Sequence, residues 1–228
     1  MTHKVAPFAH RLGITTAWRS RWISGKRMPQ YLREDYWMRE FLRERLDRTS
    51  TEHIEIERTR SQTTIFIRTS RPGLLIGRAG GGVEKLKQDL VKFVLKKMKG
   101  VLISKNIKIT VEEVKNPELQ AKLVAESIAS EIEKRLPFRR VMKGALQRVS
   151  ANKQVIGVKI ALSGRLDGGE MARDESLKQG NIPLQTFRAN IDYSSATAHT
   201  VQGTVGVKVW IYKGDTFESA SSKAQSLT

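Results

Sequence analysis

The sequence contains no cysteine, and that absence excludes two kinds of protein. Disulfide-stapled secreted domains and thiolate metal centres both require cysteine, so this chain can build neither. The sequence also lacks an apolar run long enough for a signal peptide or a membrane-spanning helix. We therefore expect a soluble, cytosolic protein from a reducing compartment.

Signatures of enzymes are missing as well. The glycine-rich stretch at residues 77–82 is followed by Val83, where a Walker A loop needs lysine. The four histidines lack the spacing of metal ligands. A group of carboxylates offers oxygen ligands for a cation, and its members are Asp167, Glu170, Asp174 and Glu175. We interpret this group as a charged loop or edge region beside Arg165 and Arg173, and expect no enzyme, no cofactor and no metal site. A metal-dependent nuclease is the alternative.

Acidic residues are too few to balance the basic ones. The chain has 41 lysines and arginines against 23 aspartates and glutamates, which gives a formal net charge of +18. A chain this basic usually binds a polyanion such as nucleic acid. Residues 1–30 contain no acid, and Phe8, Trp18 and Trp22 are interleaved with their basic residues. Such a segment can neutralise phosphates and stack on bases, so we expect an arm that becomes ordered on RNA or on a partner.

A glycine-rich loop precedes a helical pattern in the first half of the chain. The loop contains the motif GXXG at residues 77–80, and the apolar spacing over residues 83–98 predicts a helix with many lysines. A glycine loop at a helix N-terminus presents free amides and the positive end of the helix dipole, which suits a phosphate. The residues expected to contact RNA here are Gly77, Arg78, Ala79, Gly80 and Lys85.

The order of predicted elements around this loop resembles that of a type II KH domain, in which a GXXG loop clamps the nucleic-acid backbone. Residues 32–46 have a helical pattern, and alternating apolar residues predict strands at 54–58, 63–68 and 107–111. The resulting order is helix, strand, strand, short helix, GXXG, helix, strand. We place the end of this domain close to Lys115.

The second half predicts two helices and at least three strands. The helices cover residues 117–136 and 138–149, and the strands cover residues 156–162, 187–193 and 205–211. One face of the second helix is apolar, whereas Arg139, Arg140 and Lys143 share the opposite face. No acid occurs between residues 134 and 166. Uncompensated like charges on one face repel each other, so we expect this face to meet phosphate.

Many short segments together resemble the family of bacterial small ribosomal subunit protein three. They are KVAP (4–7), RLGI (11–14), RPG (71–73), IG (76–77), NPEL (116–119), LVAESI (123–128), FRRVMK (138–143), SGRL (163–166), PL (183–184), RANIDY (188–193) and GVKVWI (206–211). The chain departs from the family pattern at Ala79, at Gly81 and Gly82, and at Asp167 and Gly168.

The resemblance implies an RNA-binding protein in the head of the small ribosomal subunit. The implied partners are 16S rRNA, mRNA, and the tenth and fourteenth small-subunit proteins, with the fourth and fifth near the channel through which mRNA enters. Arg139, Arg140 and Lys143 match the family's residues on that channel. We assign rRNA binding to Lys4, Arg11, Arg19, Arg21, Trp22, Arg165, Arg173 and Arg188. A free-standing KH-domain RNA chaperone or regulator is the alternative function.

The expected fold class is therefore α+β. A type II KH domain, with a three-stranded sheet and helices on one face, comes first, and a two-layer α/β domain follows it. The expected boundaries are a basic arm at residues 1–16, the KH domain at 17–115, the C-terminal domain at 116–214 and a flexible tail at 215–228.

Overall fold

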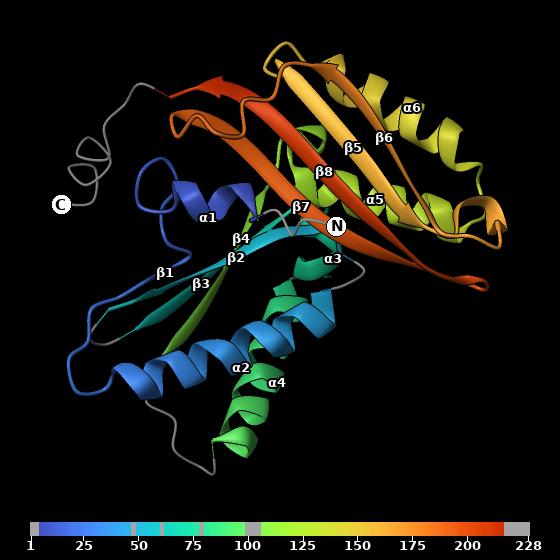
Figure 1. Cartoon of the computed structure of the whole chain (residues 1–228). Helices are drawn as coiled ribbons and strands as arrows, with labels where there is room; N and C mark the ends of the chain where they lie inside the picture. The colour runs from blue at the N-terminus through green and yellow to red at the C-terminus, as the bar shows by residue number, and fades with distance from the viewer. Residues whose placement is uncertain (1–4, 47–48, 60–61, 78–79, 99–105, 217–228) are drawn as a thin grey trace. The chain divides into compact units, whose positions relative to one another are not determined.

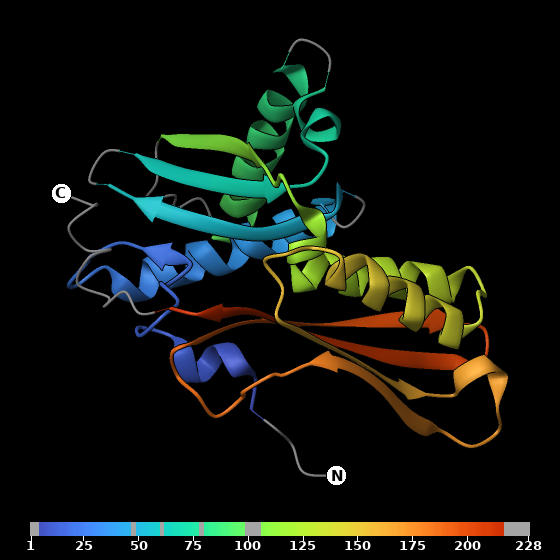
Figure 2. The ribbon, with the colours of Figure 1, turned by 90° about the horizontal axis from the view of Figure 1, so that it is seen from above.

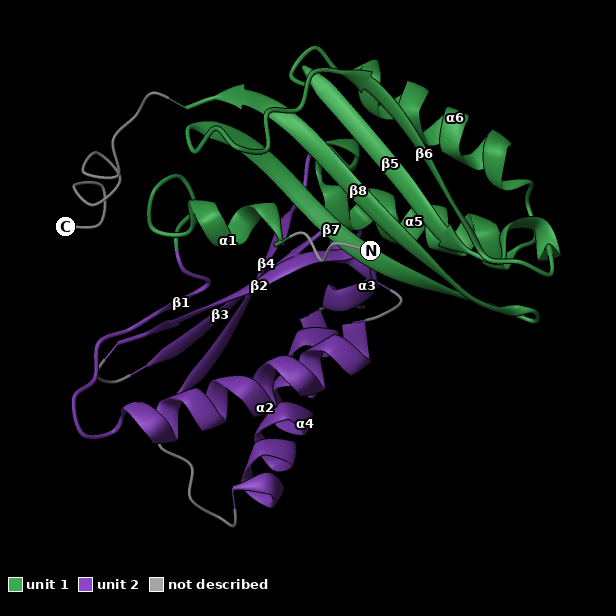
Figure 3. Cartoon of the chain, viewed as in Figure 1, with its two compact units in different colours: residues 1–17, 116–228 green, residues 18–115 purple. Residues whose placement is uncertain are grey.

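The computed structural model describes residues 5–46, 49–59, 62–77, 80–98 and 106–216. The chain divides into two compact units (Figure 3). Unit 2 is one continuous segment, Trp18–Lys115, whereas unit 1 combines residues of Met1–Ala17 with residues of Asn116–Thr228. Most of the expected tail lies outside the described residues. Among the described helices, none combines the length and the apolar character that crossing a membrane requires.

Unit 2 is a four-stranded sheet covered by helices (Figure 1). The strands are β1 (Ser20–Arg21), β2 (Thr51–Arg58), β3 (Thr63–Thr69) and β4 (Ile107–Glu113), in that spatial order. Strands β2 and β3 are antiparallel, and β4 runs parallel to β3. The helices are α2 (Met28–Leu46), α3 (Pro72–Ile76) and α4 (Gly81–Lys97). This is the order of elements expected of a type II KH domain, with a two-residue strand added at one edge.

The core of unit 2 follows from period-two alternation. Along β3, every second residue is buried, so Ile65 and Ile67 face the helices. They pack with Ile56 of β2 and with Leu42 and Leu90 of the helices. The helices thereby cover one face of the sheet.

Unit 1 places two helices on one face of an antiparallel sheet. The strands are β5 (Gly157–Gly164), β6 (Arg173–Gly180), β7 (Ala189–Thr200) and β8 (Gly203–Asp215), in the spatial order β6-β5-β8-β7. The helices are α5 (Ala121–Glu133) and α6 (Phe138–Ser150), with short turns η3 (Pro117–Leu119) and η4 (Leu166–Gly168) and the helix α1 (Pro7–Arg11). Figure 2 shows α5 and α6 side by side on one face of the sheet. The two units together confirm the predicted α+β fold class.

Strand β6 was not among the three strands expected for this unit. Its sequence, RDESLKQG, contains a single large apolar residue, Leu177, which packs against the core of unit 1. It forms because β5 offers a free sheet edge, and the two strands pair over their whole length. Two of the carboxylates interpreted as a charged loop or edge region, Asp174 and Glu175, therefore lie on the edge strand of this sheet. Within the described residues, no three acidic or histidine side chains gather as a metal site would require.

Candidate nucleic-acid interface

Helix α6 presents a basic face because its other face is committed to the core. Phe138, Val141, Met142, Ala145 and Val149 are buried in unit 1. At helical spacing, the opposite side then holds exposed Arg139, Arg140 and Lys143. Burial of the apolar face fixes the direction in which the cationic side chains point.

The start of α6 is held by a neighbouring turn. Pro137 precedes the first helical residue, and the backbone N–H of Phe138 donates to Oδ1 of Asp167 at 3.4 Å. Asp167 adopts a positive φ of 51° within η4, which brings its carboxylate to the helix end. A carboxylate at this position complements the positive end of the helix dipole. The basic face is therefore displayed from a helix that is anchored along its length and at its N-terminus.

The glycine-rich loop lies between α3 and α4, and the glycines on either side of its middle have positive φ. Gly77 ends α3 with φ of 65°, and Gly80 precedes α4 with φ of 78°. A Cβ on Gly82 would lie 2.4 Å from the carbonyl oxygen of Leu75, so the two helices approach more closely than a side chain permits. Lys85 is exposed in the first turns of α4. Two expected RNA contacts, Arg78 and Ala79, lie outside the described residues, as does Lys4.

Arg11 was expected to bind rRNA, and the structure instead gives its guanidinium an internal role. The side chain is only 2% exposed. Its Nε donates to the carbonyl oxygen of Ala189 at 2.7 Å, and Nη2 donates to that of Thr186 at 2.8 Å. Further carbonyl acceptors are those of Pro7, Pro183 and Leu184. Burial lowers the pKa of Arg11, but a guanidinium keeps its charge in proteins. The residue fastens the N-terminal segment to residues 183–189 and does not present its charge to solvent.

Trp22 also belongs to an internal contact. Its indole N–H donates to Oδ2 of Asp35 at 2.9 Å, and its ring meets Tyr31 edge-on. Asp35 and Glu34 are buried and accept from the buried Arg58 guanidinium, at 3.0 Å from Nε and 2.7 Å from Nη1. A buried charge cluster needs these partners, because an unpaired ion in the interior is costly. Trp22 is half-buried and helps to close this cluster, so contact between its ring and RNA stays a prediction.

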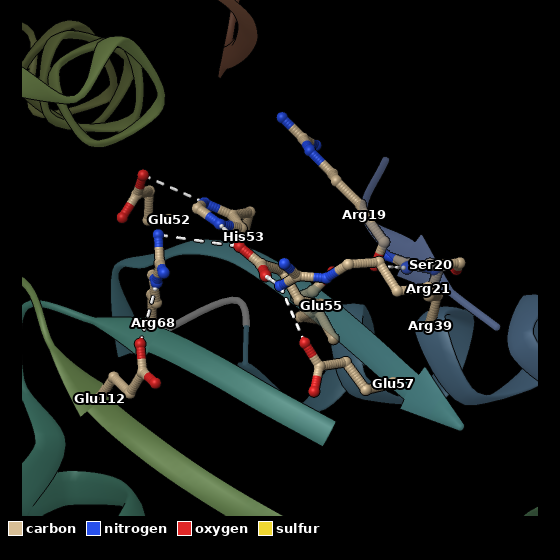
Figure 4. A network of polar contacts seen from close by, with 11 residues as sticks. Arg19, Ser20, Arg21, Arg39, Glu52, His53, Glu55, Glu57, Arg68 and Glu112 are labelled. Atoms are coloured by element: carbon tan, nitrogen blue, oxygen red, sulfur yellow. Dashed lines mark hydrogen bonds and ion pairs between the residues drawn. The ribbon is translucent and has the colours of Figure 1, made fainter. Parts of the chain in front are cut away.

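Arg21 and Arg19 behave differently, although Arg21 lies in the short strand β1 and Arg19 directly precedes it (Figure 4). Arg21 forms ion pairs with Glu55 and Glu57 of β2. Burial raises the pKa of Glu55, but the hydrogen bond with His53 and nearby cations outweigh it and leave the pKa below its ordinary value. Arg19 is exposed, and Figure 4 shows its side chain extending away from these carboxylates. Of the two, Arg19 has the geometry of a residue that can meet a phosphate.

The remaining predicted rRNA contacts lie on unit 1 and are exposed. Arg165 donates to the carbonyl oxygens of Gly169 at 2.9 Å and Gln202 at 3.2 Å. Arg188 pairs with Asp215 at 2.9 Å. The hydrogen bond with Tyr212 is the largest of the causes that lower the pKa of Asp215. Arg173 lies beside α6. These arginines are spread over unit 1 rather than gathered with the face of α6, with Arg173 as the exception.

Comparison with known proteins gives a consistent result over both units. The KH domain family matches residues 38–119, and the family "Ribosomal protein S3, C-terminal domain" matches residues 128–211. Small ribosomal subunit protein uS3 of Caldicellulosiruptor saccharolyticus is 45% identical over 226 residues, which cover 99% of this chain and 98% of the relative. The proteins of the same name from Alkalilimnicola ehrlichii and Methylococcus capsulatus are 42% and 43% identical and cover 98% and 99% of this chain.

Proposed function

Because this chain belongs to the family of small ribosomal subunit protein uS3, we propose that it lines the channel through which mRNA enters the subunit. The family assignment makes it a structural, non-enzymatic, RNA-binding component of the small ribosomal subunit, which is cytoplasmic in bacteria. The proposal adds a specific surface to that role. The exposed face of α6 contacts incoming mRNA, and other basic surfaces, including the α3–α4 loop, contact 16S rRNA.

The observation that carries the proposal is the exposed basic face of α6. Arg139, Arg140 and Lys143 project from one anchored helix, and the described residues include a single acid, Glu175, that pairs with any of the three. Arginine presents a planar fork of donors that matches phosphate and cannot lose its charge near neutral pH. Contacts of this kind hold the backbone and read no sequence. They suit a strand of variable sequence that must keep moving.

The same face favours a passive role in opening mRNA structure. The sequence has no nucleotide-binding loop to supply energy. Cations that bind phosphates of an opened strand stabilise that state, while translocation by the ribosome supplies the driving force. We propose the tenth and fourteenth small-subunit proteins as neighbours, with the fourth and fifth near the channel, on the family resemblance.

The test is to replace Arg139, Arg140 and Lys143 together with alanine. Folding and subunit assembly should remain nearly intact, because exposed substitutions shift stability by less than about 0.5 kcal/mol each. Elongation should slow on a message with a stable hairpin and not on an unstructured message of equal length. A matched control replaces three exposed lysines of the same unit, Lys134, Lys153 and Lys178, and removes the same charge.

The outcomes separate three roles. The channel role is supported if the α6 variant slows elongation on the hairpin message but not on the unstructured message, and the lysine control variant slows neither. Equal slowing on both messages contradicts it. Subunits that fail to incorporate the α6 variant would reassign the three residues to rRNA binding.

A further inference from the structure

We infer that β6 forms the second wall of the mRNA contact, with Arg173 as a further phosphate ligand and Glu175 as an internal anion that competes with the phosphate. This inference rests on the proposed role of α6, and extends it to a strand that the sequence pattern did not reveal. Strand β6 is the edge strand of its sheet and packs against α6. Figure 1 shows the two elements side by side.

One aromatic ring brings the two arginines together. Phe138 is only 2% exposed, so its ring has a fixed position at the start of α6. The guanidinium carbon of Arg139 lies 5.6 Å from the ring centroid, and that of Arg173 lies 5.4 Å from it. Both cations are therefore within the distance at which the π-face of an aromatic ring attracts them. The ring holds two like charges near each other, which favours an anion between them.

In the structure, that anion is a carboxylate. One oxygen of Glu175, Oε1, lies 3.6 Å from Nη2 of Arg139 and 3.5 Å from Nε of Arg173. Arg173 and Glu175 are two residues apart on a strand, so their side chains share the face toward α6. Glu175 thus occupies the position at which one phosphate oxygen would meet both guanidinium groups.

Both ion pairs are loose enough to exchange. Their separations exceed the 2.7–2.9 Å typical of strong charge-assisted hydrogen bonds. The Arg139 and Arg173 side chains are 73% and 51% exposed, and ion pairs this exposed contribute little to stability. A phosphate can therefore replace the carboxylate at little cost. The carboxylate in turn limits how tightly the phosphate is held, which suits a strand that must slide.

The direct test measures binding of a short uridine oligonucleotide to the purified full chain. Glu175→Gln keeps the side-chain size and removes the competing charge, so affinity should rise several-fold at low salt. Arg173→Ala should lower affinity and make the log–log salt slope shallower by about 0.7, the value for one phosphate on a single strand. Arg173→Gln, which keeps a polar side chain on a shorter stem, should do the same.

Lys178→Ala is the matched control for charge. Lys178 lies on the same strand, but its position is on the opposite face of the sheet from Arg173. The Lys178→Ala substitution therefore removes one positive charge from β6 without changing the surface beside α6. An equal loss of affinity in Lys178→Ala and Arg173→Ala would overturn the inference, because only net charge would then matter. An unchanged or lower affinity of Glu175→Gln would overturn the competing role of the carboxylate.

Ribosomes carrying the same variants separate this inference from the proposed function. If the α6 triple variant slows elongation through a hairpin and Arg173→Ala does not, the inference fails and the channel role stands. If both slow it and Lys178→Ala does not, the inference is supported. If neither the α6 triple variant nor Arg173→Ala slows elongation through the hairpin, the channel role fails. Any change in oligonucleotide binding then shows only that α6 and β6 share an RNA site. That result overturns the assignment of this site to mRNA.

Discussion

Arg11 illustrates at the scale of one residue how a basic side chain can serve the fold instead of a ligand. It occurs in a stretch without acids, and its guanidinium is satisfied by main-chain carbonyls. One of these, that of Ala189, is 178 residues away in the chain. No local pattern distinguishes such an arginine from one that binds phosphate, because both occur where acids are missing. No local pattern reveals the internal contact of Trp22 either, because its hydrogen-bond partner Asp35 lies on the separate helix α2.

We expect Arg11→Ala to destabilise unit 1. Each buried carbonyl left without a donor costs about 1–3 kcal/mol, so the free energy of unfolding should fall by at least that amount. Arg11→Lys should also destabilise, because an ammonium group cannot span acceptors arranged for a planar fork. Denaturant unfolding of the purified chain measures both.

The control for Arg11 is Arg140→Ala, which removes an exposed arginine of the same unit. It should change the free energy of unfolding by less than about 0.5 kcal/mol. If Arg11→Ala is as mild as this control, the guanidinium contributes nothing to stability. Binding to rRNA would then explain the presence of arginine at position 11 better than a role in stability does.

At the scale of elements, the α3–α4 turn depends on one glycine more than on its neighbour. A Cβ on Gly82 would meet the carbonyl oxygens of Leu75 at 2.4 Å and Ile76 at 2.9 Å. A Cβ on Gly81 would meet nothing within 4 Å. The two residues are adjacent and both begin α4, which makes them a matched pair.

We expect Gly82→Ala to lower the free energy of unfolding by about 1–3 kcal/mol, the usual cost of forcing an extra methyl group into a packed contact. The added methyl group would also push α3 away from α4 and weaken binding of rRNA at the loop between them. Gly81→Ala should be neutral or slightly stabilising, since alanine favours the helix. Thermal unfolding and binding to an rRNA fragment compare the two variants. Equal effects would contradict the close approach of α3 and α4.

The elements also show which parts of the fold the sequence could reveal. Strong alternation in β3 and a clean apolar stripe in α6 are local properties, so both elements and the exposed face of α6 were predictable. Strand β6 was not, because its pairing depends on the free edge of β5 rather than on its own composition. For the same reason the approach of Glu175 to Arg139 could not be predicted. The alternation of Arg173, Glu175 and Leu177 on one face was the only local signal.

At the scale of the whole molecule, the net charge of +18 sets how the chain responds to salt. Each phosphate neutralised contributes about −0.7 to −0.9 to the log–log slope of affinity against salt. If at least four phosphates are neutralised, the slope for structured RNA should be about −3 or steeper. Replacing the three basic residues of α6 should reduce its magnitude by about two.

Affinity measured by filter binding across a salt series tests this expectation. The control variant of Lys134, Lys153 and Lys178 removes the same charge from other parts of unit 1 and should change the slope less. A flat salt response of the unmodified chain would contradict binding through phosphates. An equal change in both variants would mean that net charge, and not the face of α6, determines affinity.

The two-segment construction of unit 1 has a consequence for the order in which a nascent chain can fold. Unit 2 is continuous, so all of its residues have been synthesised before the first helix of the second half appears. The segment that carries Arg11 is made before unit 2, whereas its carbonyl partners at residues 183–189 are made after unit 2. Closing so long a loop carries an entropic cost that the intervening folded unit can reduce. The segment that carries Arg11 can therefore dock only after unit 2 and residues 183–189 have been synthesised, so the contact of Arg11 with Ala189 forms late in the assembly of unit 1.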